Sequence, residues 1–504
     1  MDEQRDHRGM ELDHDTCYRA LLSRDRRFDG RFFVGVRTTG IYCRPICPAR
    51  TAQSRNVSFY LTAAAAQEAG FRPCLRCRPE AAPDSGAWRG VANSGVSHTV
   101  SRALGLIEMG ALDDAGVDAL CERLGVGERQ LRRLFAQHVG ASPLAVAQTR
   151  RVLLAKQLIH ESRLPMTEIA YAAGFGSVRR FNEVFQALFQ RPPSALRHGK
   201  QPDEPAGAQG EVSLLLRYRP PYDWQAMLDF LAARAIPGME RVADGVYYRT
   251  IALDGAQGTL AVCQADGPAL RATIRFPRLT SLPAIIARLR RVFDLAADPE
   301  VINAQLASTP LMAPLVANRP GLRVPGAWDG FELAVRAILG QQVTVGAAVK
   351  LAGKLVAQFG QPLAEQAADR PGLSHVFPEP TVLKDVDLAL ALGMPRARGR
   401  CLSSLAAALV ADPCLFDRQA SLEEALHKLC ALPGIGDWTA QYIAIRQLRE
   451  TDAFPAGDVG LMQAVALQEG VRPDAQTLAQ RSEAWRPWRA YAAQHLWASL
   501  GAQP

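Results

Sequence analysis

The sequence contains no apolar run long enough to cross a membrane, and its first 20 residues are polar and charged rather than hydrophobic. Lysine is scarce, with 6 residues against 52 arginines, and aromatic residues make up only 7% of the chain. These absences predict a cytoplasmic protein without a membrane segment or a secretory signal. Ten cysteines are present, and in a reducing compartment their thiols stay available for metal ions instead of forming disulfides.

Net positive charge is concentrated in the first 200 residues. They contain 29 Lys and Arg against 20 Asp and Glu, whereas the remainder contains 29 against 30. Because basic residues attract nucleic-acid phosphates, we expect the first part to bind DNA electrostatically and the rest to bind through shape and local contacts. A length of 504 residues provides material for about three or four domains.

Four cysteines form two close pairs, Cys43 and Cys47 in C-x3-C, then Cys74 and Cys77 in C-x2-C. This spacing is typical of a tetrahedral zinc site with four thiolate ligands, and taken alone it fits a purely structural zinc ribbon best. A Zn(Cys)4 centre has a formal charge of −2, so nearby arginines can neutralise it and can also hold DNA phosphates. Six arginines surround the pairs: Arg37, Arg44, Arg50, Arg72, Arg76 and Arg78.

The segments around these cysteines resemble a known family. RTTGIYCRPICPAR, NVSFY and AGFRPCLRCRP, within residues 11–82, are similar to the amino-terminal domain of the bacterial Ada adaptive-response proteins. The resemblance implies one Zn²⁺ held by the four cysteines, and a thiolate at Cys43 that accepts a methyl group from a DNA methylphosphotriester. Zinc keeps a thiolate deprotonated at neutral pH, so it would both stabilise the domain and activate the nucleophile. The acceptor would be used once, which makes this repair stoichiometric.

A second feature is an internal repeat of two helices joined by a glycine turn. Residues 115–140 and 165–193 each predict a helix, a turn at Gly125 or Gly174, and a second helix with arginines. One such pair is a weak signal, but two copies with the ending GFGSVRRFNEVFQALFQRPPSALR resemble the AraC-type DNA-binding domain over about 98–198. Any single arginine in these helices could instead be a solvated surface charge that does not contact DNA. The resemblance implies contacts with guanine edges or phosphates at Arg129, Arg132, Arg133, Arg179 and Arg180.

The chain changes character after residues 199–212, which are rich in glycine, proline and acidic residues and predict a linker. From 213 to about 300, alternating stretches such as VYYRTIAL and LRATIRF predict antiparallel strands beside two helices, and hence an α+β domain. This part contains no obvious catalytic constellation, so we expect it to be a scaffold. From about 301 the pattern predicts helices with short loops.

The helical part carries a second chemical signal, a tight turn at Gly434 and Gly436 in LCALPGIGDWTAQYIAIRQL. Glycines there allow backbone N–H groups and the following helix N-terminus to hold a phosphate. Alone such a turn means little, but Asp458 follows 22 residues after Gly436. That order resembles the helix-hairpin-helix glycosylases. With PPYDW, FELAVRAILGQQVTV and WRPWRAYAAQHLW, the resemblance extends to the 3-methyladenine glycosylase II (AlkA) family over residues 213–504.

The AlkA resemblance implies that Asp458 is the carboxylate beside an oxocarbenium-like sugar. Trp438, Tyr442 and Trp497 would form the pocket that stacks on a flipped, cationic alkylated purine; as isolated aromatics, each would more often be a core residue. Gln342 stands where the best-known members have a leucine wedge, so its wedge role stays open. Trp438 also replaces the Schiff-base lysine of lyase-active relatives, which favours a single-function glycosylase.

Together the patterns predict a multidomain, mainly α protein with α+β parts. The expected domains are a zinc-binding methyl acceptor over 1–85, an AraC-type double helix-turn-helix over 98–200, a linker over 201–212, an α+β domain over 213–300 and a helix-hairpin-helix glycosylase domain over 301–504. The carboxy-terminal P-C-H-R methyltransferase of Ada is missing, so repair of O6-methylguanine is not expected.

The predicted function is DNA alkylation repair combined with regulation. It comprises excision of 3-methyladenine-type purines, methyl acceptance from DNA phosphotriesters and methylation-activated transcription. Two alternatives remain: a glycosylase whose amino-terminal half only tethers it to DNA, and a regulator whose glycosylase half is inert. The expected partners are double-stranded DNA and RNA polymerase, and we expect a monomer that acts at the nucleoid in the bacterial cytoplasm.

Overall fold

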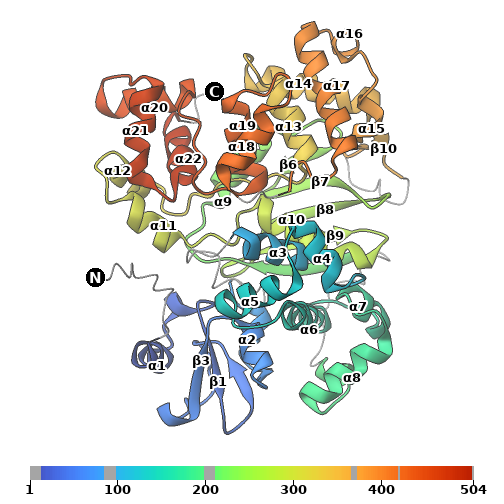
Figure 1. Ribbon diagram of the computed structural model, residues 1–504, viewed down its shortest axis with the longest axis vertical. Coiled ribbons are helices and arrows are strands. Elements are labelled where there is room, and N and C mark those ends of the chain that lie inside the picture. The colour runs from blue at the N-terminus through green and yellow to red at the C-terminus, as the bar shows by residue number, and fades with distance from the viewer. Residues whose placement is uncertain (1–12, 84–97, 198–210, 365–371, 418–420, 502–504) are drawn as a thin grey trace. The chain divides into compact units, whose positions relative to one another are not determined.

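The computed structural model describes residues 13–83, 98–197, 211–364, 372–417 and 421–501 (Figure 1). The chain divides into two compact units, Met1–Arg217 with Arg278–Ala287, and Tyr218–Pro277 with Arg288–Pro504. Helices predominate and the sheets are small, which confirms the predicted multidomain, mainly α class with α+β parts. Within the described ranges, no helix is long and apolar enough to span a membrane.

The first unit begins with a small sheet module. Its four strands lie in the order β3-β1-β2-β4; β1 is antiparallel to β2 and β3, and β2 is parallel to β4. Gly35 in β1 leaves room for two rings, since a Cβ there would lie 2.9 Å from both Phe71 and Tyr60. The elements are α1 (His14–Ser23), η1 (Arg26–Phe28), β1 (Phe33–Val36), β2 (Ile41–Cys43), η2 (Ser54–Asn56), β3 (Val57–Tyr60), α2 (Ala63–Glu68), β4 (Arg72–Pro73) and η3 (Pro79–Ala81).

The rest of the first unit is mostly helical and contains both predicted helix-turn-helix pairs, α4–α5 and α7–α8. Gly125 ends α4 with a φ of +69°, and Gly174 follows α7 with a φ of +90°. Both therefore lie in the left-handed region that glycine enters without steric cost. The elements are α3 (His98–Glu108), α4 (Val117–Leu124), α5 (Glu128–His138), α6 (Pro143–Glu161), α7 (Met166–Ala172), α8 (Val178–Phe189), η5 (Pro193–Leu196), β5 (Glu211–Arg217) and η6 (Leu279–Ser281).

Helix α6 joins the sheet module to the helix-turn-helix pairs. At its start, the backbone N–H and the hydroxyl of Ser142 donate to Glu68 of α2 at 2.9 and 2.8 Å. Further along, Lys156 is fully buried and donates to Glu80 of η3 at 2.7 Å. Two contacts a long way apart on one helix fix the module against α6.

The second unit begins with α9 (Trp224–Ala232) and an antiparallel sheet. Four strands of that sheet lie in the order β9-β8-β7-β6, with bounds β6 (Glu240–Ala243), β7 (Val246–Leu253), β8 (Ala256–Gln264) and β9 (Ala269–Arg275). Burial alternates along β9, as expected for a sheet with one covered face. Helix α10 (Leu282–Val292) follows in the chain, with residues 282–287 in the first unit and 288–292 in the second, so the predicted α+β pattern is present. The predicted linker over 201–212 lies outside the described residues except for its last two positions, which begin β5.

The remainder of the second unit is mostly helical and packs around α13 (Gly330–Leu339), in which every residue except Arg336 is buried. Apolar residues of α17, α19, α20 and α22 complete this core. The other elements are α11 (Pro299–Leu306), α12 (Met312–Asn318), α14 (Val345–Phe359), β10 (Gln361–Pro362), β11 (His375–Val376), α15 (Pro380–Leu383), α16 (Leu388–Leu392), α17 (Arg396–Ala411), α18 (Leu422–Cys430), α19 (Asp437–Ile443), η8 (Ala444–Leu448), α20 (Val459–Glu469), α21 (Ala475–Ser482), η9 (Glu483–Trp485) and α22 (Arg489–Ser499).

Candidate functional site

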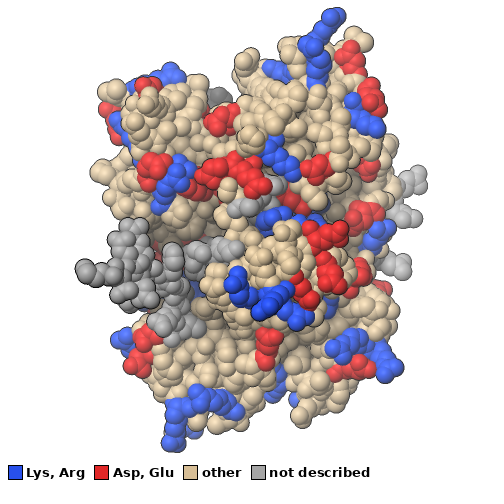
Figure 2. All heavy atoms as spheres, viewed as in Figure 1, with Lys and Arg blue, Asp and Glu red and all other residues tan. Residues whose placement is uncertain are grey.

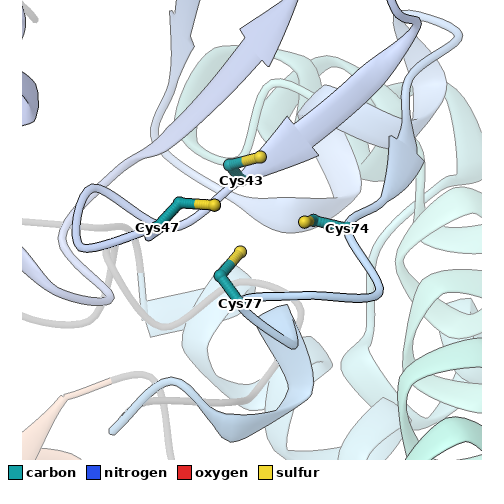
Figure 3. A group of neighbouring side chains, drawn as sticks. All are labelled: Cys43, Cys47, Cys74 and Cys77. Atoms are coloured by element: carbon teal, nitrogen blue, oxygen red, sulfur yellow. The ribbon is translucent and has the colours of Figure 1, made fainter. Parts of the chain in front are cut away.

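The four paired cysteines meet in the sheet module, and their sulfur atoms all lie within 4.8 Å of one another (Figure 3). Cys43 ends β2, Cys47 lies on the following loop, and Cys74 and Cys77 lie on the segment between β4 and η3. All four side chains point to a common centre. The residues are nearly enclosed, and Cys43 is the most exposed of them, at 9%. Such a donor set fits one tetrahedral Zn²⁺.

Backbone N–H groups support negative charge on two of the sulfurs. The N–H of Arg44 donates to Cys77 Sγ and the N–H of Arg76 to Cys74 Sγ, each at 3.3 Å. The hydrogen bond to the Cys47 sulfur, with those to Cys74 and Cys77, raises the pKa of the Cys43 thiol. Four thiolates so close together therefore need a cation between them, which is what a bound zinc ion supplies.

The arginines around the cysteines differ in what they do, and Arg44 is not available to phosphates. Its guanidinium forms a buried ion pair with Asp29 and donates to the Cys77 carbonyl at 3.1 Å. Arg78 pairs with Glu80 and Glu161 at 3.2 and 3.1 Å. Arg44 and Arg78 therefore stabilise the loops that carry the four cysteines. The side chains still exposed to solvent belong to Arg37, Arg50 and Arg76.

The five predicted DNA-contacting arginines are exposed on the second helix of each helix-turn-helix pair. Arg129, Arg132 and Arg133 lie on α5, and Arg179 and Arg180 lie on α8. Pairs one helical turn apart, such as Arg132 with Glu128 and Arg179 with Glu183, keep these side chains close to their own helix. On the face shown in Figure 2, basic side chains occur in separate groups among acidic ones.

Asp458 lies at the start of α20 and accepts three hydrogen bonds. The N–H of Leu461 donates to Oδ1 at 2.8 Å, so the carboxylate caps the helix. Two indole N–H groups complete the set: Trp497 donates to Oδ1 at 3.1 Å and Trp438 to Oδ2 at 2.5 Å. The structure thus brings the predicted catalytic carboxylate into direct contact with two of the three predicted pocket aromatics.

The third aromatic stacks on the first. The rings of Trp438 and Tyr442 lie 5.3 Å apart between centroids with an interplanar angle of 11°. They are four residues apart on α19, the spacing that places side chains on one helix face. Both line a cavity of about 870 Å³ together with Asp458 and Trp497. The predicted pocket residues therefore share one cavity in the second unit.

The cavity also reveals residues that the sequence did not single out. Phe230 of α9 and Arg234, in the turn after that helix, line it, although the region from 213 to 300 carried no catalytic signal and was expected to be only a scaffold. Arg446, on a π-helical turn after α19, lines it as well. The stretch FLAARA could not identify these residues, because the sequence pattern of a residue that lines a cavity is the same as that of any half-buried residue of a helix.

The glycine turn leads into α19, and Gly436 caps that helix. Gly434 has a φ of +82°, and a Cβ there would lie 2.7 Å from Cys401 Sγ, so only glycine fits. Gln341 donates to the Gly434 carbonyl and to Thr439 at 3.1 and 3.2 Å, which fixes the neighbouring loop to the turn. Gln342 is exposed at the tip of that loop with a φ of +57°.

Three family descriptions match the chain: a metal binding domain of Ada over residues 16–80, a helix-turn-helix domain over 120–199 and an AlkA N-terminal domain over 213–329. A probable bifunctional transcriptional activator/DNA repair enzyme AlkA from Mycobacterium tuberculosis is 42% identical over 494 residues, which cover 97% of each chain. The chain belongs to this family. It is a DNA-binding repair protein that joins an Ada-type zinc domain and a helix-turn-helix domain to a DNA glycosylase of the AlkA type.

Two shorter relatives each match one part of the chain. DNA-3-methyladenine glycosylase 2 of Escherichia coli is 38% identical over 295 residues, covering 57% of this chain and 98% of that protein. The E. coli activator and repair enzyme Ada is 33% identical over 188 residues, covering 37% of this chain and 50% of that protein. A solved 3-methyladenine DNA glycosylase from Archaeoglobus fulgidus has the same fold over 56% of this chain and 97% of its own, with a TM-score of 0.50 and 22% identity.

Proposed function

We propose that the cavity around Asp458 excises cationic alkylated purines of the 3-methyladenine type from DNA. The glycosidic bond of such a base is already weak, because the base leaves as a neutral molecule. What the site must supply is an anion beside the sugar, where positive charge develops. Asp458 supports this role because its two oxygens are fixed by a helix N-terminus and two indoles, which orient it before the reaction begins.

The aromatic side chains would hold the flipped base. Trp438, Tyr442 and Trp497 offer electron-rich faces to a positively charged purine inside an enclosed space. The turn at Gly434 and Gly436 would hold a phosphate of the DNA backbone with its N–H groups and the start of α19. Gln342, exposed at its loop tip, would fill the gap that the flipped base leaves and bond the orphaned partner base.

The test is release of free bases from methylated DNA. Asp458→Asn keeps the helix cap but removes the charge, so we expect excision to fall at least a hundredfold, about 3 kcal/mol in transition-state stabilisation, with DNA affinity nearly unchanged. Asp474→Asn is the matched control, because Asp474 caps α21 in the same way and lies outside the cavity. Excision by Asp458→Asn within tenfold of the unsubstituted protein would place the catalytic carboxylate elsewhere.

We further propose that Cys43 accepts a methyl group from DNA methylphosphotriesters. A bound Zn²⁺ keeps the sulfurs anionic, and Cys43 is the ligand with the largest exposed fraction. Its sulfur would attack the methyl carbon; the S–C bond forms, the C–O bond breaks, and the phosphodiester leaves with the electron pair. Cys43→Ser should therefore abolish transfer of one methyl per chain, while Cys17→Ser, a buried cysteine outside the cluster, should leave that stoichiometry unchanged.

Methyl transfer would also switch DNA binding. A zinc centre with four thiolates has a formal charge of −2 and repels phosphates; after methylation of Cys43 the charge is −1. One unit charge about 6 Å from a phosphate, at an effective dielectric near 20, corresponds to roughly 2–3 kcal/mol before salt screening. Promoter affinity of the full chain should therefore rise on methylation, and the gain should shrink as salt increases. Equal affinities at low salt would favour the alternative in which the amino-terminal half is only a tether.

We also propose that the protein activates transcription through contact with RNA polymerase, made by surfaces of the first unit other than the helices that bind DNA. We propose that the protein acts as a monomer at the nucleoid in the cytoplasm, where DNA is its substrate. The five domain boundaries given above, from 1–85 to 301–504, remain part of the same proposal. Sedimentation of the full chain with and without promoter DNA tests the monomer.

A further inference from the structure

Arg446 extends the aromatic stack of the cavity. Its guanidinium carbon lies 5.1 Å from the centroid of Tyr442 and 5.5 Å from that of Trp497. Trp438, Tyr442 and Arg446 are thus successive members of one stack along α19 and η8. The π-helical turn over Ala444–Leu448 makes this possible, because one extra residue in the turn makes a spacing of eight residues equivalent to about two α-helical turns.

This guanidinium is a buried charge without a carboxylate partner. Arg446 is 3% exposed, and it donates to the Pro325 carbonyl at 2.8 Å and to Gln494 Oε1 at 3.2 Å, both neutral acceptors. Among the described residues no Asp or Glu lies within ion-pair distance of it, and its Nε donates to no acceptor there. Burial lowers the pKa of Arg446 to about 10, which still leaves it charged at neutral pH.

Two other arginines that line the cavity are neutralised. Arg249 pairs with Glu332 at 2.8 Å, and Arg336 pairs with Glu332 at 2.8 Å and with Glu240 at 2.5 Å. Two arginines and two glutamates there sum to zero. Arg446 instead contacts aromatic rings and neutral oxygens, so no ion-paired carboxylate cancels its field on whatever occupies the cavity.

We propose that Arg446 is an electrostatic specificity residue that promotes departure of the base and extends the substrate range to neutral purines. This inference rests on the proposed glycosylase function. When the C1′–N bond breaks, the electron pair goes to the base and positive charge appears on the sugar beside Asp458. A cationic alkylated purine becomes neutral, so its repulsion from Arg446 disappears. A neutral purine becomes an anion, which Arg446 attracts until it takes a proton from water. For both classes of base, the oxygen of a water molecule forms the new bond to C1′ of the sugar.

The two classes of substrate should respond differently when this charge is removed. A cationic base should bind more tightly without the repulsion of Arg446, which lowers KM, but its departure should no longer relieve that repulsion, which lowers kcat. The two effects cancel, so kcat/KM for a cationic base should change little. For a neutral base, binding is unaffected, so only kcat should fall. A unit charge about 8 Å away at an effective dielectric near 20 predicts about a thirtyfold loss, about 2 kcal/mol, for the neutral base alone.

The experiment compares excision of 7-methylguanine, a cationic base, with excision of hypoxanthine, a neutral base, from otherwise identical DNA duplexes. Arg446→Met removes the charge and keeps the length, Arg446→Lys keeps the charge, and Arg481→Met is a surface control on α21 paired with Glu469. We expect the ratio of kcat/KM, 7-methylguanine over hypoxanthine, to rise about thirtyfold in Arg446→Met and to change less than threefold in Arg446→Lys and Arg481→Met. Arg446→Gln, which can still donate to the Pro325 carbonyl, carries the same test if the Met variant does not fold.

Equal losses for both bases in Arg446→Met, or no change in the ratio, would overturn this inference, because a merely structural role cannot distinguish the charge of the base. Such a result would leave the glycosylase proposal intact as long as the unsubstituted protein releases 7-methylguanine and Asp458→Asn does not. If the unsubstituted protein releases neither base, the proposed function itself fails.

Discussion

At the scale of single residues, Gly434 is under two independent constraints. Its φ of +82° is strained for any residue with a side chain, and Cys401 lies directly against its Cα. Gly434→Ala should therefore destabilise the second unit by about 2–3 kcal/mol, from backbone strain and overpacking together. Urea unfolding followed through the tryptophans of that unit would measure this loss.

A neighbouring glycine provides the control. Gly436 has a φ of −89°, and no atom would lie within 4 Å of a Cβ there, so Gly436→Ala should cost less than about 1 kcal/mol. Combining Gly434→Ala with Cys401→Ala should recover part of the stability, because the sulfur is then absent. If the two glycine variants were equally stable, the contact with Cys401 would not be what requires glycine at position 434.

The candidate site could be predicted to different depths at different residues. Trp438 and Tyr442 are four residues apart, so helical periodicity alone places them on one face, and the structure stacks their rings. Arg446 also follows Tyr442 by four residues, but it lies eight residues after Trp438, and its alignment with both rings depends on a π-helical turn that no spacing rule anticipates. Phe230 lies more than 200 residues before Trp438, Tyr442 and Asp458, and only tertiary packing brings it to the same cavity.

At the scale of secondary structure, α6 depends on a buried ion pair. Lys156 is 0% exposed and pairs with Glu80, and burial would raise the pKa of Glu80 if Lys156 and Arg78 did not lower it by more. Lys156→Met leaves that carboxylate buried and unpaired, so we expect a loss of about 3–5 kcal/mol in the unfolding of the first unit. Differential scanning calorimetry of the zinc-loaded protein would measure it.

A double substitution distinguishes charge from packing. Lys156→Met with Glu80→Gln removes both charges and should restore most of the lost stability. Arg179→Met breaks an exposed pair with Glu183 on α8 and should change the stability of the first unit very little. A double variant no more stable than Lys156→Met would show that Lys156 contributes through its contacts with the metal loop, such as the Cys74 carbonyl, and not through its charge.

Helix α22 contains a buried group that titrates. Burial, with the nearby charge of Arg319, lowers the pKa of His495 to about 4 from an ordinary value of 6.5. The unfolded state therefore binds the proton first, so this histidine supports folding fully above about pH 6.5 and progressively less as pH falls toward 4. Hydrogen exchange of α22 amides should show an opening free energy about 3 kcal/mol smaller at pH 4 than at pH 6.5. His495→Gln should flatten this dependence, whereas His427→Gln, on the exposed side of α18, should not.

At the scale of the whole molecule, the two chemical sites belong to separate units. The four cysteines lie within Met1–Arg217, and the residues that line the cavity all belong to the second unit. Removing zinc with a chelator should therefore unfold the sheet module, because structural zinc supplies most of the folding free energy of so small a module. Base release from methylated oligonucleotides should continue.

Two measurements check this independence. Titration of accessible thiols should rise by five per chain after chelation, from the four ligands and from Cys17, which is buried in the same module. The rate of base release should stay within about twofold when DNA is saturating. If base release were lost on chelation while the accessible thiols increase, the glycosylase would need the folded sheet module. The same assay on a protein refilled with zinc controls for irreversible damage.

The general architecture was accessible from sequence because its signals are local: cysteine spacing, glycine turns and alternating strands each involve neighbouring residues. Which segments of the chain belong to each compact unit could not be predicted from the sequence. Arg278–Ala287 belongs with the first unit although it lies between strands and helices of the second, and the start of β5 falls where a linker was expected. Such groupings depend on contacts between residues far apart in the chain, which periodicity does not encode.

The stack of Trp438, Tyr442 and Arg446 has a consequence for how this sequence can evolve. Its members lie on one uninterrupted helical segment, so their alignment depends on counting residues as much as on their identities. Inserting or deleting one residue between 438 and 446 would rotate the later members out of the stack by roughly 100°. Descendants of this chain should therefore tolerate exchanges of side chains between these positions far more readily than changes in the length of the segment.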